Sequence, residues 1–232
     1  MSNCVIITGA SSGLGRELSK IYAAAGWFLI INGQDRRRLA ETAEMCSRKP
    51  GDVLQCAGDL RDDSVLRELG FFAEMHHCKH LITSAALYHN CPFEKMAASS
   101  IEELLTVNAI AVMKTIRVVL PAMIDLRNGT IVGINSSAGK NAAVNETAYV
   151  ASKHALTGFF KTLRFELRTS GVRVMDIFIG GMKTPMMKDR PDYNLLMDPV
   201  EVAQVIFQNV TNPIHSAQIE ELSLGRFIFP LV

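Results

Sequence analysis

The sequence predicts an α/β fold in a single domain, a doubly wound parallel sheet with helices on both faces. Short runs of apolar and β-branched residues recur along the chain, as in strands that are buried on both sides. Amphipathic stretches of helical length separate these runs, so strands and helices alternate throughout. A length of 232 residues suits one well-buried domain, 1–232, and leaves little room for a second.

The composition narrows the range of partners. The formal net charge is +1, which gives no reason to expect nucleic acid or an anionic membrane as a partner. No segment approaches ~18 uninterrupted apolar residues, so we expect no membrane-spanning helix. The start of the chain lacks a basic region and does not resemble a signal peptide. Five scattered cysteines, an odd number, suit buried thiols in a reducing cytoplasm better than a disulfide framework.

The first elements suggest a phosphate site. Residues 4–7 form an apolar strand that runs into the turn Thr8-Gly-Ala-Ser-Ser-Gly-Leu-Gly15, and an amphipathic helix follows and ends at Gly26. Glycines in such a turn let the backbone approach a pyrophosphate at the positive end of a helix. A glycine-rich turn alone is weak evidence, because turns before helices are often rich in glycine. The flanking strand and helix strengthen the phosphate interpretation.

The second strand, 27–31, leads to the residues that would meet an adenosine ribose. Asp35 can bind a ribose hydroxyl, but we favour an N-cap for the helix that begins at Arg36. Arginines at 36–38 oppose the macrodipole of a first helical turn unless an anion lies nearby. A solvated run would also explain them, so they favour the 2′-phosphate of NADP over NAD without deciding between the two cofactors.

The middle of the chain continues the alternation, with strands at 53–56 and 80–84 and a helix at 64–75 between them. The histidine-rich run 76–80 has no second ligand pair at a metal-site spacing, so we read it as a solvated helix end. A long apolar helix is expected over 101–125 with Pro121 near its end. Asn108 lies inside it, either as a structural hydrogen-bonding residue or as part of a catalytic site.

A fifth strand, 130–134, brings Ser136 to the sheet edge where ligands collect. Tyr149 and Lys153 follow, four residues apart and therefore on one face of a helix. A phenol has an unperturbed pKa of ~10, and we expect the lysine cation to lower it. Ser136 can donate to a carbonyl or alkoxide oxygen. These three side chains predict a proton-transfer site for a carbonyl and alcohol pair.

The rest of the chain completes the sheet. The Tyr-Lys helix is expected to continue over 150–169, with an apolar face of Ala151, Ala155, Leu156, Phe159 and Leu163. Further elements are a strand at 172–178, a helix from Pro199 to about 210 capped by Asp198, and a strand at 218–224. The methionine- and leucine-rich loop at about 185–199 is either a substrate lid or ordinary packing. The apolar tail 227–232 either packs in the core or covers a subunit contact.

Together these features resemble the short-chain dehydrogenase/reductase family over about residues 5–224. The turn matches the family's cofactor motif TGxxxGxG, and Asp59 matches its adenine-contacting aspartate. The family's Asn-Ser-Tyr-Lys tetrad matches Asn108, Ser136, Tyr149 and Lys153. Three departures concern the cofactor site: Ser84-Ala85-Ala86 replaces the family's N-A-G, Ile179-Gly180 replaces Pro-Gly, and Ser12 and Gln34 stand where NADP-dependent members often carry basic residues.

The resemblance implies a Rossmann-like fold and an NAD(P)-dependent oxidoreductase that exchanges a hydride with a carbonyl or secondary alcohol. Tyr149 would act as general acid/base, Lys153 would hold the nicotinamide ribose, Ser136 would polarise the substrate oxygen, and the Asn108 region would seat a proton-relay water. The residues expected to bind NADP, or else NAD, are Gly9, Ser11, Ser12, Gly13, Leu14, Gly15, Gln34, Arg36, Asp59, Leu60, Ser84, Ala85, Tyr149, Lys153, Gly180, Met182 and Thr184.

The resemblance also implies a homodimer or homotetramer, because the family commonly pairs two long helices between subunits, here 101–125 and 150–169. The alternative to an enzyme is a nucleotide-binding regulator or scaffold with the same fold and little turnover. The altered run at 84–86 motivates that alternative, whereas the intact tetrad argues against it.

Overall fold

The computed structural model describes residues 3–49, 51–212 and 217–226. Its strands are β1 (Cys4–Thr8), β2 (Phe28–Gly33), β3 (Val53–Ala57), β4 (His80–Thr83), β5 (Gly129–Ser136), β6 (Val172–Ile179) and β7 (Glu221–Leu224). Its α-helices are α1 (Gly13–Ala24), α2 (Arg36–Cys46), α3 (Asp63–Met75), α4 (Ala98–Leu105), α5 (Ala111–Asp125), α6 (Thr147–Leu167) and α7 (Pro199–Thr211). Short 3₁₀ turns lie at Phe93–Lys95, Ser137–Gly139, Pro185–Met187 and Tyr193–Leu195.

The predicted doubly wound parallel sheet is confirmed. The strands form one sheet in the order β3-β2-β1-β4-β5-β6-β7, and every neighbouring pair is parallel. The strand order reverses between β1 and β4. In sheets of this kind the point of reversal opens a crevice at the carboxyl ends of the strands, where ligands bind. The glycine-rich turn follows β1 at this edge.

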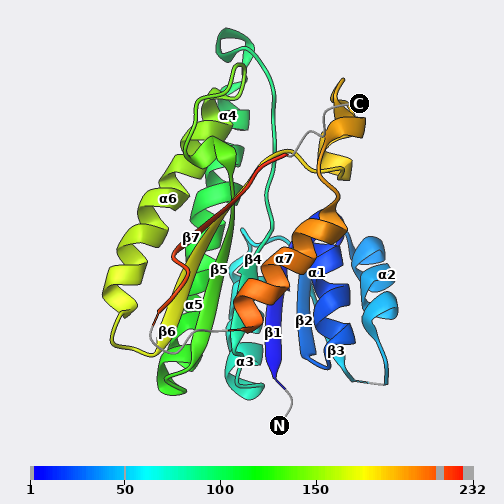
Figure 1. Cartoon of the computed structure of the whole chain (residues 1–232), viewed down its shortest axis with the longest axis vertical. Coiled ribbons are helices and arrows are strands. Elements are labelled where there is room, and N and C mark those ends of the chain that lie inside the picture. Colours follow the sequence, from blue (N-terminus) through cyan, green and yellow to red (C-terminus); the bar gives the residue numbers. More distant parts are fainter. Residues whose placement is uncertain (1–2, 50, 213–216, 227–232) are drawn as a thin grey trace, which may run out of the picture.

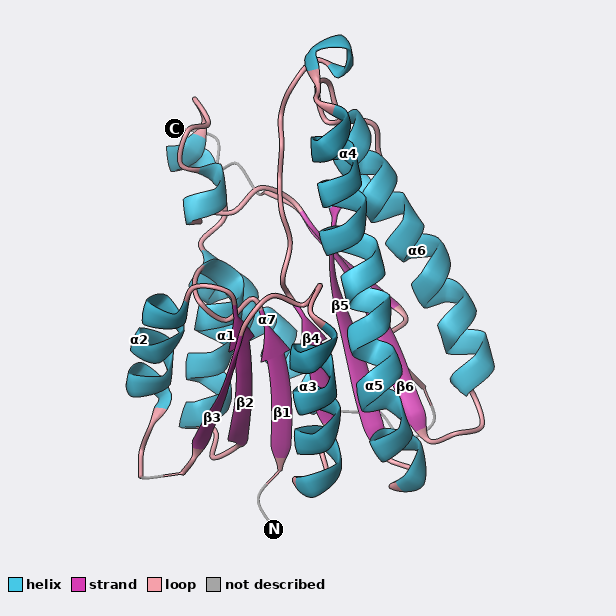
Figure 2. Ribbon diagram, turned by 180° about the vertical axis from the view of Figure 1, so that it is seen from behind, coloured by secondary structure: helices cyan, strands magenta, loops and turns pink. Residues whose placement is uncertain are grey.

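The central strands are apolar because helices cover both faces of the sheet (Figure 1, Figure 2). Every residue of β1 is buried. Successive side chains of a strand point to opposite faces, so Val5 and Ile7 join the core under α1, α2 and α7, whereas Cys4 and Ile6 join the core under α3, α5 and α6. This arrangement explains why the strands read as continuous hydrophobic runs rather than as alternating patterns.

The long helix predicted over 101–125 is interrupted. The helical run begins earlier, at Ala98, and between α4 and α5 it contains a π-helical turn, Thr106–Ile110. Such turns are rare and often occur at functional sites; this one holds Asn108 in the interior, fully buried. By length and composition the run Ala98–Asp125 also qualifies as a candidate membrane span. In the structure α5 packs against α3, β4 and β5, and α4 packs against α6, so that 44% of the apolar window is buried.

The Tyr-Lys helix has a different inner face from the predicted one. Leu156 and Leu163 are buried as expected, but Ala151 and Ala155 are exposed, and Phe160 rather than Phe159 is fully buried. The reason is that Tyr149 and Lys153 themselves point inward, and their positions fix the rotation of the whole helix. The prediction that Ala151 and Ala155 lie on the buried face of this helix is therefore wrong.

Most other boundaries agree with the sequence. Asp35 and Asp198 cap α2 and α7 by accepting hydrogen bonds from Arg38 N and Val200 N, respectively. The last strand is shorter than the predicted 218–224, and the tail 227–232 lies outside the described residues. The histidine-rich run is only partly a solvated helix end, because His80 is buried in β4, where its Nδ1 lies 2.9 Å from the Tyr22 hydroxyl.

Candidate active site

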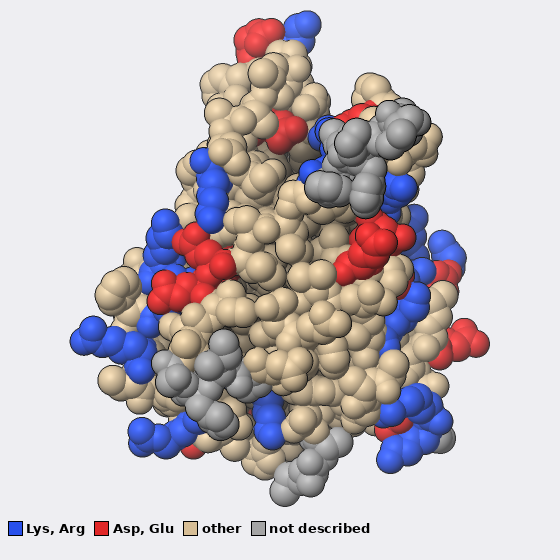
Figure 3. Space-filling view, in the orientation of Figure 1, with Lys and Arg blue, Asp and Glu red and all other residues tan. Residues whose placement is uncertain are grey.

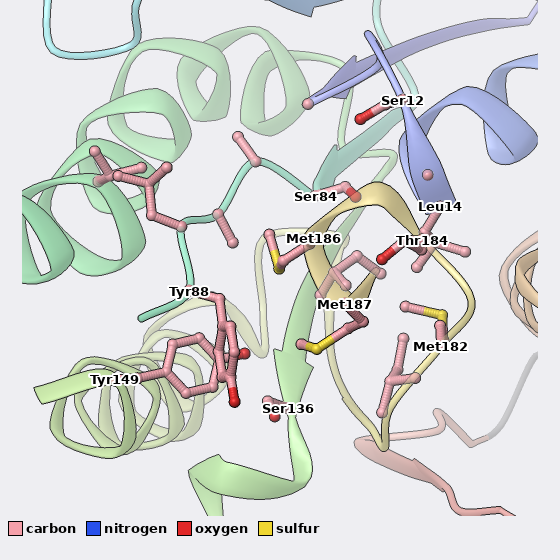
Figure 4. Close-up of a pocket in the computed structure, with 18 of the residues that line it drawn as sticks. Ser12, Leu14, Ser84, Tyr88, Ser136, Tyr149, Met182, Thr184, Met186 and Met187 are labelled. Carbon is pink, nitrogen blue, oxygen red and sulfur yellow. The ribbon is translucent and has the colours of Figure 1, made fainter. Parts of the chain in front are cut away.

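A cavity of about 650 Å³ opens at the carboxyl edge of the sheet. It runs from the ends of β1, β2 and β3 to the end of β5 and the first turn of α6, and the loop after β6 closes one side. Its size falls within the range of small-molecule and cofactor sites. Figure 4 shows Ser12, Leu14 and Thr184 at one end, and Tyr88, Tyr149 and Ser136 at the other.

The glycine-rich turn has the geometry of a phosphate cradle. Gly9 and Gly13 adopt the positive φ angles of +68° and +54°, which favour glycine. A Cβ on Gly9 would lie 2.7 Å from Ala85 Cα, so the turn packs directly on the loop after β4. Helix α1 starts at Gly13, and its N-cap Ser12 makes no side-chain capping bond. The N–H groups of its first turn are therefore available to an anion.

Ser11 provides a second sign that the cradle suits a cofactor. Its hydroxyl oxygen is buried and has no hydrogen-bond partner among residues 3–49, 51–212 and 217–226. Buried hydroxyls without a partner are unusual in folded proteins. The hydroxyl lies in the lining of the cavity, close enough to Gly33 that a Cβ there would collide with it. The cradle thus fits the pyrophosphate and ribose of a dinucleotide.

Most of the predicted cofactor contacts do line the cavity. They are Gly9, Ser11, Ser12, Gly13, Leu14, Gln34, Asp59, Leu60, Ser84, Ala85, Tyr149, Lys153, Gly180, Met182 and Thr184. Gly15 does not: a Cβ there would lie 2.5 Å from Gly9 O, so this glycine lets α1 pack on the turn. Arg36 does not line the cavity either. Arg38 does, because it lies two residues further round the first turn of α2.

The loop after β4 is fixed at both ends by side chains from elsewhere in the chain. Thr8 Oγ1 accepts hydrogen bonds from Ser84 N at 3.1 Å and from Ala85 N at 3.3 Å. Asn108 Oδ1 accepts from Leu87 N at 2.7 Å, and its amide nitrogen donates to Leu87 O at 2.9 Å. The same nitrogen donates to Ser152 Oγ on α6 at 3.1 Å. Asn108 therefore does not line the cavity but clamps the loop against α6.

The three predicted proton-transfer residues converge at one end of the cavity. Tyr149 and Lys153 project from α6, and Ser136 ends β5. The Lys153 Nζ lies 5.8 Å from the centroid of the Tyr149 ring and donates to Ile134 O at 3.2 Å. Both side chains are almost entirely buried. This geometry places a phenol, a hydroxyl and an ammonium around one reaction volume.

The electrostatics of Tyr149 differ from the prediction. Its pKa is raised to about 12: burial is the largest cause, the Ser136 hydroxyl opposes it, and nearby Glu146 and Tyr88 add smaller increases. The group that lowers this pKa is the Ser136 hydroxyl and not the lysine, whose ammonium donates to the Ile134 carbonyl. Burial in turn lowers the pKa of Lys153 to about 8, and Asp176 opposes that effect. Tyr149 is accordingly a neutral phenol at pH 7.

Several cavity residues were not anticipated from the sequence. The Tyr88 ring meets Tyr149 edge-on with centroids 5.1 Å apart, and its hydroxyl donates to Glu146 Oε1 at 2.7 Å. Arg190, from the loop after β6, lines the same end and pairs with Asp192 at 2.9 Å. These residues lie in loops without a recognisable motif, so only the fold brings them together.

Part of the loop at 185–199 lines the cavity, and its role as a substrate lid stays a prediction. Met186 and Met187 lie in a 3₁₀ turn and face the cavity, where Figure 4 shows them between the two ends. Met182 and Met197 form an isolated bridge that anchors both ends of the loop. The loop therefore has fixed ends and a methionine-lined middle, which suits adaptable contacts with a ligand.

Comparison with known proteins agrees with this site. The family model described as short chain dehydrogenase matches residues 3–194. Sulfoacetaldehyde reductase 2 of Chromohalobacter salexigens is 32% identical, over 93% of this chain and 91% of that protein. Dehydrogenase/reductase SDR family member 7B of Danio rerio is 31% identical, over 89% of this chain and 73% of the relative.

Solved structures share the fold over nearly the whole chain. The 3-oxoacyl-[acyl-carrier protein] reductase from Brucella melitensis superposes with a TM-score of 0.86 at 26% identity, covering 97% of this chain and 90% of that one. A metagenomic short-chain oxidoreductase in complex with NADP gives a TM-score of 0.82 at 25% identity, covering 97% and 98%. The chain belongs to the short-chain dehydrogenase/reductase family and is an NAD(P)-dependent oxidoreductase.

Proposed function

We propose that Tyr149 is the general acid/base of a reaction in which a carbonyl compound and its alcohol are interconverted at the β5 and α6 end of the cavity. The observation that carries the proposal is the placement of Tyr149, Ser136 and Lys153 in the same cavity as the glycine-rich cradle. A nicotinamide dinucleotide held by that cradle would donate or accept the hydride. The remaining chemistry is proton transfer at the substrate oxygen, which these side chains can perform.

Each side chain has a distinct part in this reaction. The Tyr149 hydroxyl gives its proton to the substrate oxygen during reduction and takes it back during oxidation. Ser136 donates a hydrogen bond that stabilises the developing negative charge on that oxygen. Lys153, whose Nζ lies 5.8 Å from the centroid of the Tyr149 ring, would bind the ribose hydroxyls of the dinucleotide. Because the pKa of Tyr149 is raised to about 12, the resting protein carries the protonated phenol that reduction requires.

The decisive experiment uses Tyr149→Phe, with Tyr193→Phe as the matched control. Tyr193 lies in the loop after β6 and does not line the cavity. Oxidation of NADPH and NADH is followed against a panel of ketones and aldehydes that includes apolar and acidic members. We expect Tyr149→Phe to lower kcat by about 100-fold or more, with cofactor dissociation constants and circular dichroism unchanged, and Tyr193→Phe to stay near wild type.

A scaffold function would give a different result. The wild-type protein would then bind cofactor without oxidising it in the presence of any carbonyl compound, and Tyr149→Phe would change nothing. That outcome would replace the enzymatic proposal with the nucleotide-binding alternative.

We further propose that the cofactor is NADP(H) rather than NAD(H). Arg38 lines the adenosine end of the cavity, and the first turn of α2 contains no acidic residue. The carboxylates of Asp35 and Asp59 line this end of the cavity, and both have partners: Asp35 caps α2 and forms a 3.3 Å pair with Arg38, and Asp59 pairs with Arg61 at 2.6 Å. A guanidinium at this position suits a 2′-phosphate.

Three arginines in one helical turn offer matched variants for testing this choice. We expect Arg38→Ala to weaken NADPH binding about tenfold, the loss of one partly exposed charge-assisted contact, while NADH binding stays within about twofold. Arg36→Ala, at an exposed position outside the cavity, should change neither. Equal losses for both dinucleotides in Arg38→Ala would contradict the 2′-phosphate assignment.

We propose a homodimer or homotetramer formed through the outer faces of α4, α5 and α6. Ile110 between α4 and α5 is 47% exposed, and Phe165 on α6 is 73% exposed. Three exposed residues of α6, Ala151, Ala155 and Gly158, are small, which permits close helix packing along that line of the helix. Sedimentation should show an oligomer for the wild type and a monomer for Phe165→Glu. A monomeric wild type at micromolar concentration would exclude this assembly.

We also propose that the protein works in the cytoplasm without a nucleic-acid or membrane partner. All five cysteines are free thiols, and four of them are buried. Lys and Arg are interspersed with Asp and Glu on the face shown in Figure 3, so this face presents no broad surface of one sign. Fractionation of cells that express the protein, with and without a carbonate wash of the membranes, tests the location.

A further inference from the structure

A buried carboxylate that no motif identified lies behind the catalytic lysine. Asp176 is in β6, opposite Gly133 of β5 and Glu221 of β7, and is 1% exposed. Strand alternation places it on the same face of the sheet as Val174, which belongs to the core under α6. Asp176 therefore points at the helix that carries Tyr149 and Lys153.

A short polar network connects Asp176 to this helix. Its Oδ2 accepts a hydrogen bond from Asn135 Nδ2 at 3.2 Å. The same nitrogen lies 3.1 Å from Thr157 Oγ1 and 3.4 Å from Lys153 O, so its two hydrogens are shared among three acceptors. The carbonyl side of the amide accepts from Ser136 N at 2.8 Å. Asn135 thus joins Asp176, the backbone of Lys153 and the backbone of Ser136.

The second oxygen of Asp176 is available to attract a cation. Oδ1 is buried and has no hydrogen-bond partner in the part of the chain that the structure describes. Lys153 Nζ forms a hydrogen bond with Ile134 O and, among the described residues, no ion pair within 4.0 Å. A buried ammonium requires a compensating negative charge nearby, and Asp176 is the carboxylate that raises the pKa of Lys153.

The other charges around Asp176 have partners of their own. Arg164 of α6 donates to Val174 O at 3.0 Å and to Glu220 O at 2.6 Å. Glu221 of β7 pairs with Lys140 at 2.7 Å and with Lys161 at 3.7 Å. Burial and Glu221 raise the pKa of Asp176, to about 6, while Asn135, Lys153 and Arg164 lower it. At pH 7 the carboxylate is therefore mostly ionised.

We propose that Asp176 is a positioning residue that acts through Lys153: its buried carboxylate keeps the lysine ammonium charged, and Asn135 ties both to the strand that carries Ser136. The inference rests on the proposed role of Lys153. Its consequence is an upper pH limit for activity that depends on a residue that touches neither substrate nor cofactor. Removing the negative charge while keeping the shape, in Asp176→Asn, should make Lys153 lose its proton at lower pH.

The test measures Lys153 directly in cofactor-free protein. Protein labelled with ¹³C at lysine Cε is titrated by NMR, and the Lys153 signal is assigned by its loss in Lys153→Arg. We expect the pKa of Lys153 to fall by about one unit in Asp176→Asn. Glu221→Gln is the control, because it removes a carboxylate on the neighbouring strand that already has lysine partners; it should leave the Lys153 titration nearly unchanged. An unchanged Lys153 titration in Asp176→Asn would overturn the proposal.

The pH profile of kcat/KM separates this inference from the proposed function. We expect the alkaline limb to move with the lysine, by the same amount and in the same direction. If the NMR titration shifts and the profile does not, Lys153 is not the group that limits activity at high pH, and the part proposed for Lys153 in the reaction is wrong, whereas the dependence of its charge on Asp176 stands. If Asp176→Asn does not fold, the Asp176 carboxyl is titrated by NMR in wild-type protein labelled with ¹³C at aspartate. An Asp176 carboxyl that stays protonated at pH 8 would overturn the proposal, because a neutral carboxyl cannot stabilise the Lys153 ammonium.

Discussion

The buried pair of His80 and Tyr22 should make the stability of this protein sensitive to acid. His80 opens β4, and its Nδ1 lies 2.9 Å from the Tyr22 hydroxyl of α1. Its ring also packs on Trp27, with centroids 4.4 Å apart. Burial, together with Arg173 and Lys79, lowers the pKa of His80 to about 3. The folded protein therefore keeps this imidazole neutral at pH values where the unfolded chain charges it.

The magnitude follows from the difference between the two pKa values. An unfolded histidine takes up a proton near pH ~6.5, whereas the folded one does so only near pH 3. The folded state thus loses stability as the pH falls below 6.5, and between pH 7 and pH 5 the loss from this one group is about 2 kcal/mol. Asp176 works in the opposite direction: its pKa is raised to about 6, so the folded state gains stability as that carboxyl is protonated.

The assay must therefore isolate the histidine from the other titrating groups. Urea unfolding is measured at pH 7 and pH 5 for the wild type and for Tyr22→Phe/His80→Leu, in which both partners become apolar and neither is left unpaired. Asp176 is common to the two proteins and cancels in the comparison. We expect the wild type to lose about 2 kcal/mol more than the double variant between these pH values. Parallel losses, within about 0.5 kcal/mol, would refute the reasoning.

Three further variants test how the site is built. Gly9→Ala places a Cβ 2.7 Å from Ala85 Cα at a φ of +68°. We expect calorimetry to show that cofactor binding is lost, and the free energy of unfolding to fall by about 1–3 kcal/mol. Retained cofactor affinity would contradict the assignment of this turn as a phosphate cradle. Asn108→Ala leaves both Leu87 backbone groups without their partner. We expect the free energy of unfolding to fall by about 1–3 kcal/mol and the Leu87 amide to exchange its hydrogen faster. An unchanged exchange rate at Leu87 would contradict the role of Asn108 in holding the loop. Phe160→Ala empties a fully buried position; thermal or urea unfolding should show a loss of about 3–5 kcal/mol, whereas a loss under 1 kcal/mol would mean that the core collapses around it.

The fold and the placement of Tyr149, Ser136 and Lys153 in one cavity could be predicted because they depend on local patterns. The buried strands are short apolar runs, the glycine-rich turn lies between a strand and a helix, and Asp35 and Asp198 are good N-cap residues at positions where helices begin. The spacing of Tyr149 and Lys153 places them on one helix face wherever that helix packs. Interactions within about one helical turn are visible in the sequence.

The remaining features depend on contacts between distant segments. Whether Arg36 or Arg38 lines the cavity depends on the orientation in which α2 packs on the sheet. A run of three adjacent arginines does not indicate that orientation. The raised pKa of Tyr149 comes mainly from burial, to which the distant Tyr88 in the loop after β4 adds; of the groups that raise it, Glu146 is the one that lies close to Tyr149 in the sequence. No local pattern marks Asp176, because its hydrogen-bond partner Asn135 lies 41 positions away in the chain.

The contacts that fix the loop after β4 determine which substitutions this loop can tolerate. Thr8 and Asn108 hold its main chain through amides and a carbonyl, so its path does not depend on which side chains the loop itself carries. Ser84, Ala85 and Ala86 can differ from the family's usual residues there without displacing the wall of the cavity. Substitutions in this loop can therefore change the affinity for the dinucleotide without changing the shape of the crevice.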